Sequence, residues 1–185
     1  MTDRQQSGVD YLLVSGSPRD GNTDYLLHRI SNSLDGKKET IFLRKQTIAY
    51  CTGCLSCHTT KHCSIGDDMT IISEKIITAK ALVLATPNYF ENVSGLFKTF
   101  VDRLQPQYKT YALRNKETAI LMVTGKRTDE SIIHLRSSVE GFVEHLGLDL
   151  RFMAVFEGLH SNDLKQSLSF QSELEEAITA IKQMG

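Results

Sequence analysis

The sequence predicts an α/β fold in which a doubly wound sheet of five parallel strands is covered by helices on both faces. Short apolar runs alternate with stretches of helical period, the order typical of parallel β-α-β units. The chain has 185 residues, 41% of them apolar, which suffices for the core of one such domain. No repeat, low-complexity tract or linker divides it. We therefore expect a single domain over residues 1–185, with residues 1–8 as a flexible tail.

Five segments are expected to be strands: residues 10–15, 39–44, 81–86, 118–124 and 150–156. Helices are expected where apolar residues recur every three or four positions. These positions are Leu26, Ile30 and Leu34; Met69, Ile72 and Ile76; Leu96, Phe100 and Leu104; Ile132, Leu135, Val139, Phe142 and Leu146; and Leu174, Ile178 and Ile181. This succession favours a flavodoxin-like sheet with strand order 2-1-3-4-5. Ligands of such sheets bind at the carboxyl ends of strands 1 and 3, where the winding reverses.

Charge and hydropathy exclude several classes of partner. The 21 basic and 22 acidic residues give a net charge of -1, and no basic cluster is long enough to attract a nucleic acid. The first eight residues are polar and lack the apolar core of a signal peptide. No apolar stretch approaches the ~20 residues of a membrane span. We expect a cytoplasmic protein that binds neither membranes nor nucleic acids.

The segment SGSPRDGNT, Ser15 to Thr23, lies between the first strand and the first helix. It is nearly a nucleotide-triphosphate loop, but Asn22 stands where that motif requires lysine. Two glycines allow close backbone approach, and the helix N-terminus favours an anion. The side chains that can contact this anion are Ser17, Asn22, Thr23 and one cation, Arg19. The loop therefore favours a terminal monophosphate; the alternative is a glycine-containing turn without a ligand.

A second segment follows the third strand, where Thr86 is succeeded by Pro87, Asn88, Tyr89 and Phe90. This loop should lie on the opposite side of the same switch point. Proline and aromatic side chains provide rigid walls for a flat heteroaromatic ring, and the amide can meet its heteroatoms. Taken alone, the segment is also compatible with a plain strand-to-helix turn.

With these two motifs, GSPRDGNT and TPNYFENVSGLFKTFVDR, the chain resembles the NADPH-dependent FMN reductase family over roughly residues 10–156. The resemblance implies that FMN binds with its phosphate in the first loop and its ring against the second. It also implies that the loop after the fourth strand approaches the ring from the other side. The cofactor-binding residues expected on this basis are Ser15, Ser17, Arg19, Asn22, Thr23, Pro87, Asn88, Tyr89, Phe90, Thr124 and Gly125.

All four cysteines lie in one segment, with the spacing C-x2-C-x2-C-x5-C: Cys51, Cys54, Cys57 and Cys63. A compact run with a more distant fourth thiolate is typical of [4Fe-4S] clusters. Unligated or redox-active thiols are the main alternative, followed by zinc or a disulfide. The cysteine pattern resembles that of the iron-sulfur flavoproteins, so these four residues are the candidate metal ligands.

Charged residues near these motifs are expected to have structural roles. Asp67 and Asp68 are expected to cap the helix that begins at Met69. Asp102 and Arg103 are expected to tie their helix to a neighbouring element or to a second subunit, without a chemical role.

The expected function is that of an FMN-dependent NAD(P)H oxidoreductase that delivers electrons to a quinone, a flavin or a similar acceptor. Bound FMN supplies this chemistry, so the chain needs no acid-base residue. The alternatives are an iron-sulfur flavoprotein that carries electrons from ferredoxin, and a ligand-free interaction module. Flavoproteins that this chain resembles commonly pair their subunits over the flavin, which implies a homodimer or homotetramer.

Overall fold

The structure, a computed structural model, describes residues 8–158, 160 and 163–185. The expected flexible tail therefore lies outside the described residues, except for Gly8. Five parallel strands form one sheet: β1 (Tyr11–Ser15), β2 (Lys38–Phe42), β3 (Ala81–Tyr89), β5 (Glu117–Thr124) and β6 (Asp149–Glu157). Their order is β2-β1-β3-β5-β6, which confirms the predicted flavodoxin-like topology.

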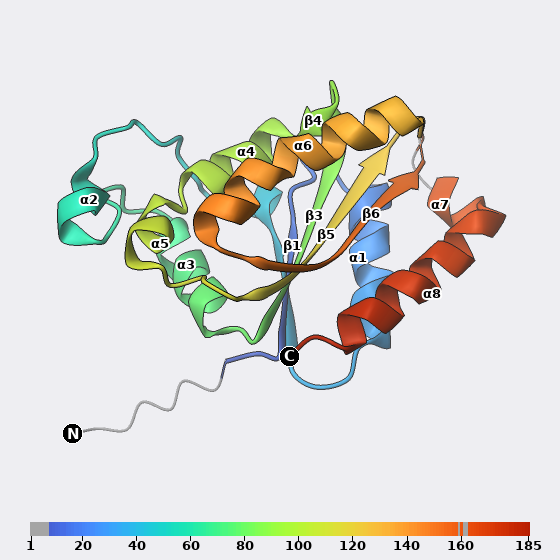
Figure 1. Ribbon diagram of the computed structural model, residues 1–185, viewed down its shortest axis with the longest axis horizontal. Coiled ribbons are helices and arrows are strands. Elements are labelled where there is room, and N and C mark those ends of the chain that lie inside the picture. The colour runs from blue at the N-terminus through green and yellow to red at the C-terminus, as the bar shows by residue number, and fades with distance from the viewer. Residues whose placement is uncertain (1–7, 159, 161–162) are drawn as a thin grey trace.

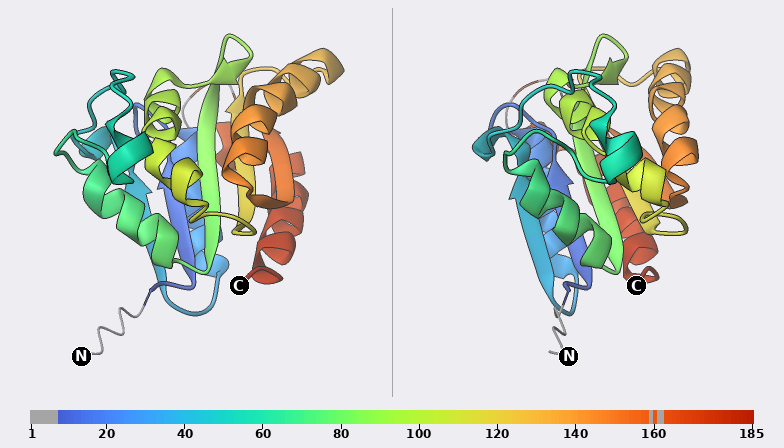
Figure 2. Two further views of the ribbon diagram at one scale, coloured as in Figure 1. Left: turned by 60° about the vertical axis from the view of Figure 1, so that its left-hand side comes forward. Right: turned by 90° about the vertical axis from the view of Figure 1, so that its left-hand side faces the viewer.

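Helices cover both faces of the sheet, as predicted (Figures 1 and 2). One face packs against α1 (Asn22–Ser33) and α8 (Leu168–Lys182), and the other against α3 (Met69–Thr78), α4 (Gly95–Asp102) and α6 (Asp129–Leu146). Short elements complete the described chain: η1 (Leu43–Lys45), α2 (Ser56–Thr60), α5 (Gln105–Thr110) and α7 (Asp163–Gln166). Within the described ranges, no helix combines the length and the apolar character needed to cross a bilayer.

The alternation of side chains along the strands creates two hydrophobic cores. In β1, Leu12 and Val14 belong to the core beneath α3, α4 and α6, whereas Tyr11 and Leu13 belong to the core beneath α1 and α8. Successive strand residues point to opposite faces, so a strand covered on both sides must be apolar throughout. This requirement explains why the strands were visible in the sequence as short apolar runs.

The largest difference from the predicted elements lies after Thr86, where β3 continues to Tyr89. Its last two residues pair with an additional antiparallel strand, β4 (Asn92–Val93). Phe90 and Glu91 form the connecting turn, with φ angles of 53° and 58°. Such turns usually contain Asn or Gly because they require positive φ. Phe90 and Glu91 do not carry that signature, so no local pattern indicated a hairpin.

The third predicted helix is also divided. It ends at Asp102, and Leu104 becomes the first residue flanking α5, which contains Pro106 in its first turn. Proline fits a first turn but cannot continue a preceding helix, because it lacks the backbone N–H. The chain therefore changes direction at Arg103, and this places α5 beside α2 and the cysteine segment (Figure 1).

Candidate functional site

Polar side chains are buried together at the carboxyl ends of β1, β3 and β5 and in the loops that follow. They are Ser15, Ser17, Asn22, Thr23, Asp24, Thr86, Ser94 and Thr124. Burying a polar group is unfavourable unless it finds a partner. Such a concentration at the switch point of a doubly wound sheet is typical of a ligand site.

Ser94 fastens the loop after β3 to the loop after β1. Its hydroxyl donates to Gly16 O at 2.6 Å and accepts from Phe97 N at 3.1 Å, so it also caps α4. Its own amide donates to the Thr86 hydroxyl at 3.1 Å. A side chain at Gly16 would place its Cβ 2.6 Å from Phe97 Cβ, so this close approach requires glycine. Ser94 was not predicted as a functional residue, although a serine before a helix is a recognised N-cap signal.

The predicted phosphate loop lies at the N-terminus of α1, where the N-cap residue is Gly21 and has no side chain to cap the helix. Ser17 is buried, and its hydroxyl donates to Arg19 O at 2.6 Å; Arg19 itself is exposed. The Asn22 side chain donates to Gly158 O at 3.0 Å and to His160 O at 2.8 Å. Asn22 thus holds the segment after β6 against the start of α1.

Beneath this loop lies a charged pair that the sequence analysis missed. Asp24, the third residue of α1, is completely buried and accepts a hydrogen bond from the Ser15 hydroxyl at 2.5 Å. Its second carboxylate oxygen forms an ion pair with Arg44 in η1. Strand register explains the meeting, since Ser15 lies opposite Phe42 and Arg44 follows two residues later. The contact depends on which strands are neighbours, so no local sequence pattern could have indicated it.

On the other side of β1, Asn88 and Thr124 meet at the ends of β3 and β5. Asn88 Nδ2 donates to the Thr124 hydroxyl at 2.9 Å, while Thr124 O accepts from Gly158 N at 2.8 Å. Asn88 Oδ1 is buried and has no hydrogen-bond partner within the described part of the chain. Tyr89 is 42% exposed, and Phe90 at the hairpin tip is fully exposed. The structure therefore brings Asn88 and Thr124 together and leaves Phe90 outside the buried cluster.

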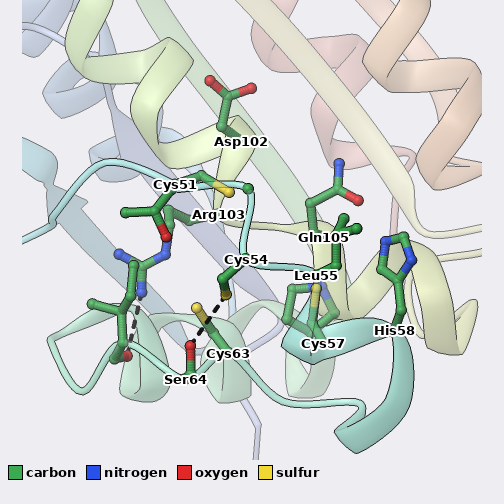
Figure 3. A pocket seen from close by; sticks show the side chains of 14 residues that line it. Cys51, Cys54, Leu55, Cys57, His58, Cys63, Ser64, Asp102, Arg103 and Gln105 are labelled. Carbon is green, nitrogen blue, oxygen red and sulfur yellow. Dashed lines mark hydrogen bonds between the residues drawn. The ribbon is translucent and has the colours of Figure 1, made fainter.

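The cysteine segment projects from the side of the sheet and contains α2 (Figure 1). All four cysteines line one cavity of about 450 Å³, which Asp102, Arg103, Gln105 and Pro106 also line (Figure 3). Across the residues that the structure describes, no three His, Cys, Asp or Glu side chains are close enough to hold one metal ion. The four thiols are the kind of donor that a metal cluster uses, but this structure spreads them around the cavity and does not gather them into a ligand set.

Cys54 is the thiol most disposed to ionise. Its Sγ is hydrogen-bonded to the hydroxyls of Ser56 and Ser64, each at 3.4 Å. These contacts lower the pKa of Cys54 to about 6, so the thiolate predominates at neutral pH. Burial has the opposite effect on Cys57 and raises the pKa of that thiol.

Arg103 ties the residues on either side of the cysteine segment, Ala49 and Asp67, to the end of α4. Its guanidinium donates to the two Asp67 oxygens at 2.6 and 2.9 Å and to Ala49 O at 2.7 Å, and it is almost completely buried. The prediction that these side chains tie their helix to another element is therefore confirmed for Arg103, whereas Asp102 pairs with Lys98 of the same helix. Asp67 also accepts from Met69 N at 3.1 Å, as predicted for an aspartate at the start of α3. The capping expected of Asp68 is wrong, because its side chain caps no amide of α3 and accepts from Thr47 N at 2.7 Å instead.

Several known proteins are similar to this chain in sequence or in fold. An iron-sulfur flavoprotein of Archaeoglobus fulgidus is 37% identical over 120 residues, which cover 63% of this chain and 59% of that protein. YwqN of Bacillus subtilis, provisionally named an NAD(P)H-dependent FMN-containing oxidoreductase, is 26% identical over 88% of this chain and 94% of its own. The apo structure of the NADH:FMN oxidoreductase EMOB has the same fold, with a TM-score of 0.64 at 21% identity over 94% of this chain and 88% of that one.

The family itself is established by a longer match. The family model described as NADPH-dependent FMN reductase matches residues 9–147, which include both loops at the carboxyl edge and the cysteine segment. The protein belongs to the NADPH-dependent FMN reductase family.

Proposed function

We propose that the chain is an FMN-dependent NAD(P)H oxidoreductase that reduces a quinone, a flavin or a similar small acceptor. The observation that carries the proposal is the cluster of buried polar side chains at the carboxyl edge, between the uncapped start of α1 and the Asn88–Thr124 pair. Bound there, FMN would supply the redox chemistry, since it accepts a hydride from a nicotinamide and releases electrons singly or in pairs.

The chain's own task in this proposal is to bind and orient the cofactor. The first amides of α1 and the hydroxyls of Ser17 and Thr23 meet the phosphate, because a helix N-terminus favours an anion. Asn88, held in place by Thr124, would offer its Oδ1, which has no partner among the described residues, to an N–H group of the flavin ring. Pro87 and Tyr89 would flank the ring, with the exposed Arg19 and the partly buried Gly125 in the loops after β1 and β5.

The nicotinamide donor has no dinucleotide fold of its own, because the sequence lacks G-x-G-x-x-G. It must therefore stack transiently over the flavin. We further propose that the protein acts in the cytoplasm as a homodimer or homotetramer in which a second subunit covers the flavin. The exposed Tyr89 and Phe90 at the hairpin tip support such a contact, since exposed aromatic residues often mark interfaces.

A second candidate function is that of an electron carrier with a [4Fe-4S] cluster held by Cys51, Cys54, Cys57 and Cys63. It is supported by the single cavity that these cysteines line and by the name of the Archaeoglobus relative. Electrons would then come from a protein donor such as ferredoxin. This chain spans 59% of that relative's length, so the electron-carrier function is a proposal for this chain.

Anaerobic reduction of the FMN-loaded protein distinguishes the two candidates. We expect NADPH or NADH to bleach the flavin absorbance and a simple quinone to restore it through repeated turnovers. Bleaching by reduced ferredoxin alone would favour the electron carrier. If neither donor reduces the bound flavin, both proposals are wrong.

A further inference from the structure

The Asp24 carboxylate occupies an unexpected place for a site that receives a phosphate. It belongs to the first turn of α1, directly after Thr23, and no part of it is exposed. The proposed function assigns this same turn to the FMN phosphate. Two negative charges so close in a buried setting repel each other much more strongly than in water. An uncompensated Asp24 would therefore weaken phosphate binding.

Arg44 supplies the compensating charge from a different strand. Its guanidinium pairs with Asp24 and lies 4.9 Å from the centre of the Phe42 ring, so both its charge and its position are fixed. The adjacent Lys45 contacts the same ring at 5.1 Å but is exposed, and it pairs with no carboxylate in the portion of the chain that the structure describes. Proximity to the ring is thus shared by both cations, whereas neutralisation of Asp24 is specific to Arg44.

We propose that Arg44 is a positioning residue for the phosphate end of FMN, because its charge cancels that of Asp24 beneath the phosphate loop. The inference rests on the proposed function. The phosphate then meets a neutral pair instead of a buried anion. The Ser15 hydroxyl, which donates to the other Asp24 oxygen, helps to hold the buried carboxylate in place.

This arrangement makes a prediction about selectivity. Riboflavin carries the same ring and side chain as FMN but lacks the phosphate, so only FMN senses the charge of the pair. Wild type and the double variant Asp24→Asn/Arg44→Gln have a neutral pair, Arg44→Gln leaves one negative charge, and Asp24→Asn leaves one positive charge. The ratio of FMN affinity to riboflavin affinity should fall when the pair carries a negative charge and should not fall when the pair is neutral or positive.

The experiment is a fluorescence titration of the apoprotein and its variants with FMN and with riboflavin. We expect Arg44→Gln to lower FMN affinity by about tenfold or more while leaving riboflavin affinity unchanged. Arg44→Lys, which keeps the charge, and the double variant should both restore the wild-type ratio, and Asp24→Asn should equal or exceed it. Lys45→Gln is the matched control, because it removes an adjacent positive charge but leaves Asp24 paired with Arg44.

Three outcomes would overturn the inference. Equal losses of FMN and riboflavin affinity in Arg44→Gln would show that Arg44 only supports the local fold. An unchanged ratio in both Arg44→Gln and Asp24→Asn would show that the phosphate does not sense the pair. If wild type binds FMN no better than riboflavin, the phosphate site itself is wrong. Thermal unfolding of each variant identifies loss of fold, and if Arg44→Gln does not fold, Asp24→Asn and the double variant still test the charge order.

Discussion

Replacing Arg103 by methionine is expected to lower the free energy of unfolding by about 3–5 kcal/mol, the usual cost of removing one partner from a buried ion pair. Asp67 would remain buried without its two hydrogen bonds from the guanidinium. The Ala49 carbonyl, which accepts from Arg103 at 2.7 Å, would lose its partner as well. Because these contacts fasten both ends of the cysteine segment, the segment should also exchange its amide hydrogens faster.

Lys98→Met is the control for the Arg103 substitution. Lys98 lies on the same helix and pairs with Asp102, but the two side chains are 60% and 44% exposed. An exposed pair of this kind contributes at most about 1 kcal/mol. Urea unfolding monitored by circular dichroism gives both values. A loss in Arg103→Met no larger than that in Lys98→Met would contradict the structural role assigned to Arg103.

Replacing Cys54 by alanine is expected to remove most of the iron from anaerobically purified protein while FMN stays bound. The wild type should contain about four irons and four sulfides per chain, the content of one cubane cluster. Cys54 is the best single test because its contacts with the Ser56 and Ser64 hydroxyls favour the thiolate that a metal requires. Retention of FMN is expected because the phosphate loop and Asn88 lie outside the cavity that the cysteines line.

The control for the Cys54 substitution is His58→Ala. His58 lines the same cavity and is exposed, yet four cysteines already complete a cluster, so iron should remain. Iron and sulfide are measured chemically in parallel with the visible spectrum. If wild-type protein reconstituted without oxygen holds neither iron nor sulfide, the cluster is wrong. The cysteines are then ordinary or redox-active thiols, and the oxidoreductase proposal stands without them.

The positions of the strands and helices could be predicted because each of their determinants is local. Strands buried on both faces must be apolar, and helices must present an apolar residue every three or four positions, so both periods are visible in the sequence. The two candidate binding loops were visible for a related reason, since each directly follows a strand. Neither the pairing of Asn88 with Thr124 nor the burial of Ser17 was needed to locate these loops.

Contacts between distant segments account for most of what could not be predicted. Arg44 meets Asp24 only because β1 and β2 are neighbours in register, and Arg103 reaches Asp67 only because the chain turns before Pro106. The β3–β4 hairpin was missed for a different reason, because Phe90 adopts a positive φ that its side chain does not favour. In each case the three-dimensional arrangement, not a local pattern, determines the contact.

We propose that the carboxyl edge of this sheet holds FMN by its single phosphate. Titration of the apoprotein with FMN and with FAD, with both dissociation constants measured, tests this proposal. We expect FMN to bind more tightly, because the loop offers one helix N-terminus and one arginine to a single phosphate and carries no dinucleotide fingerprint. Equal or tighter binding of FAD would contradict the account.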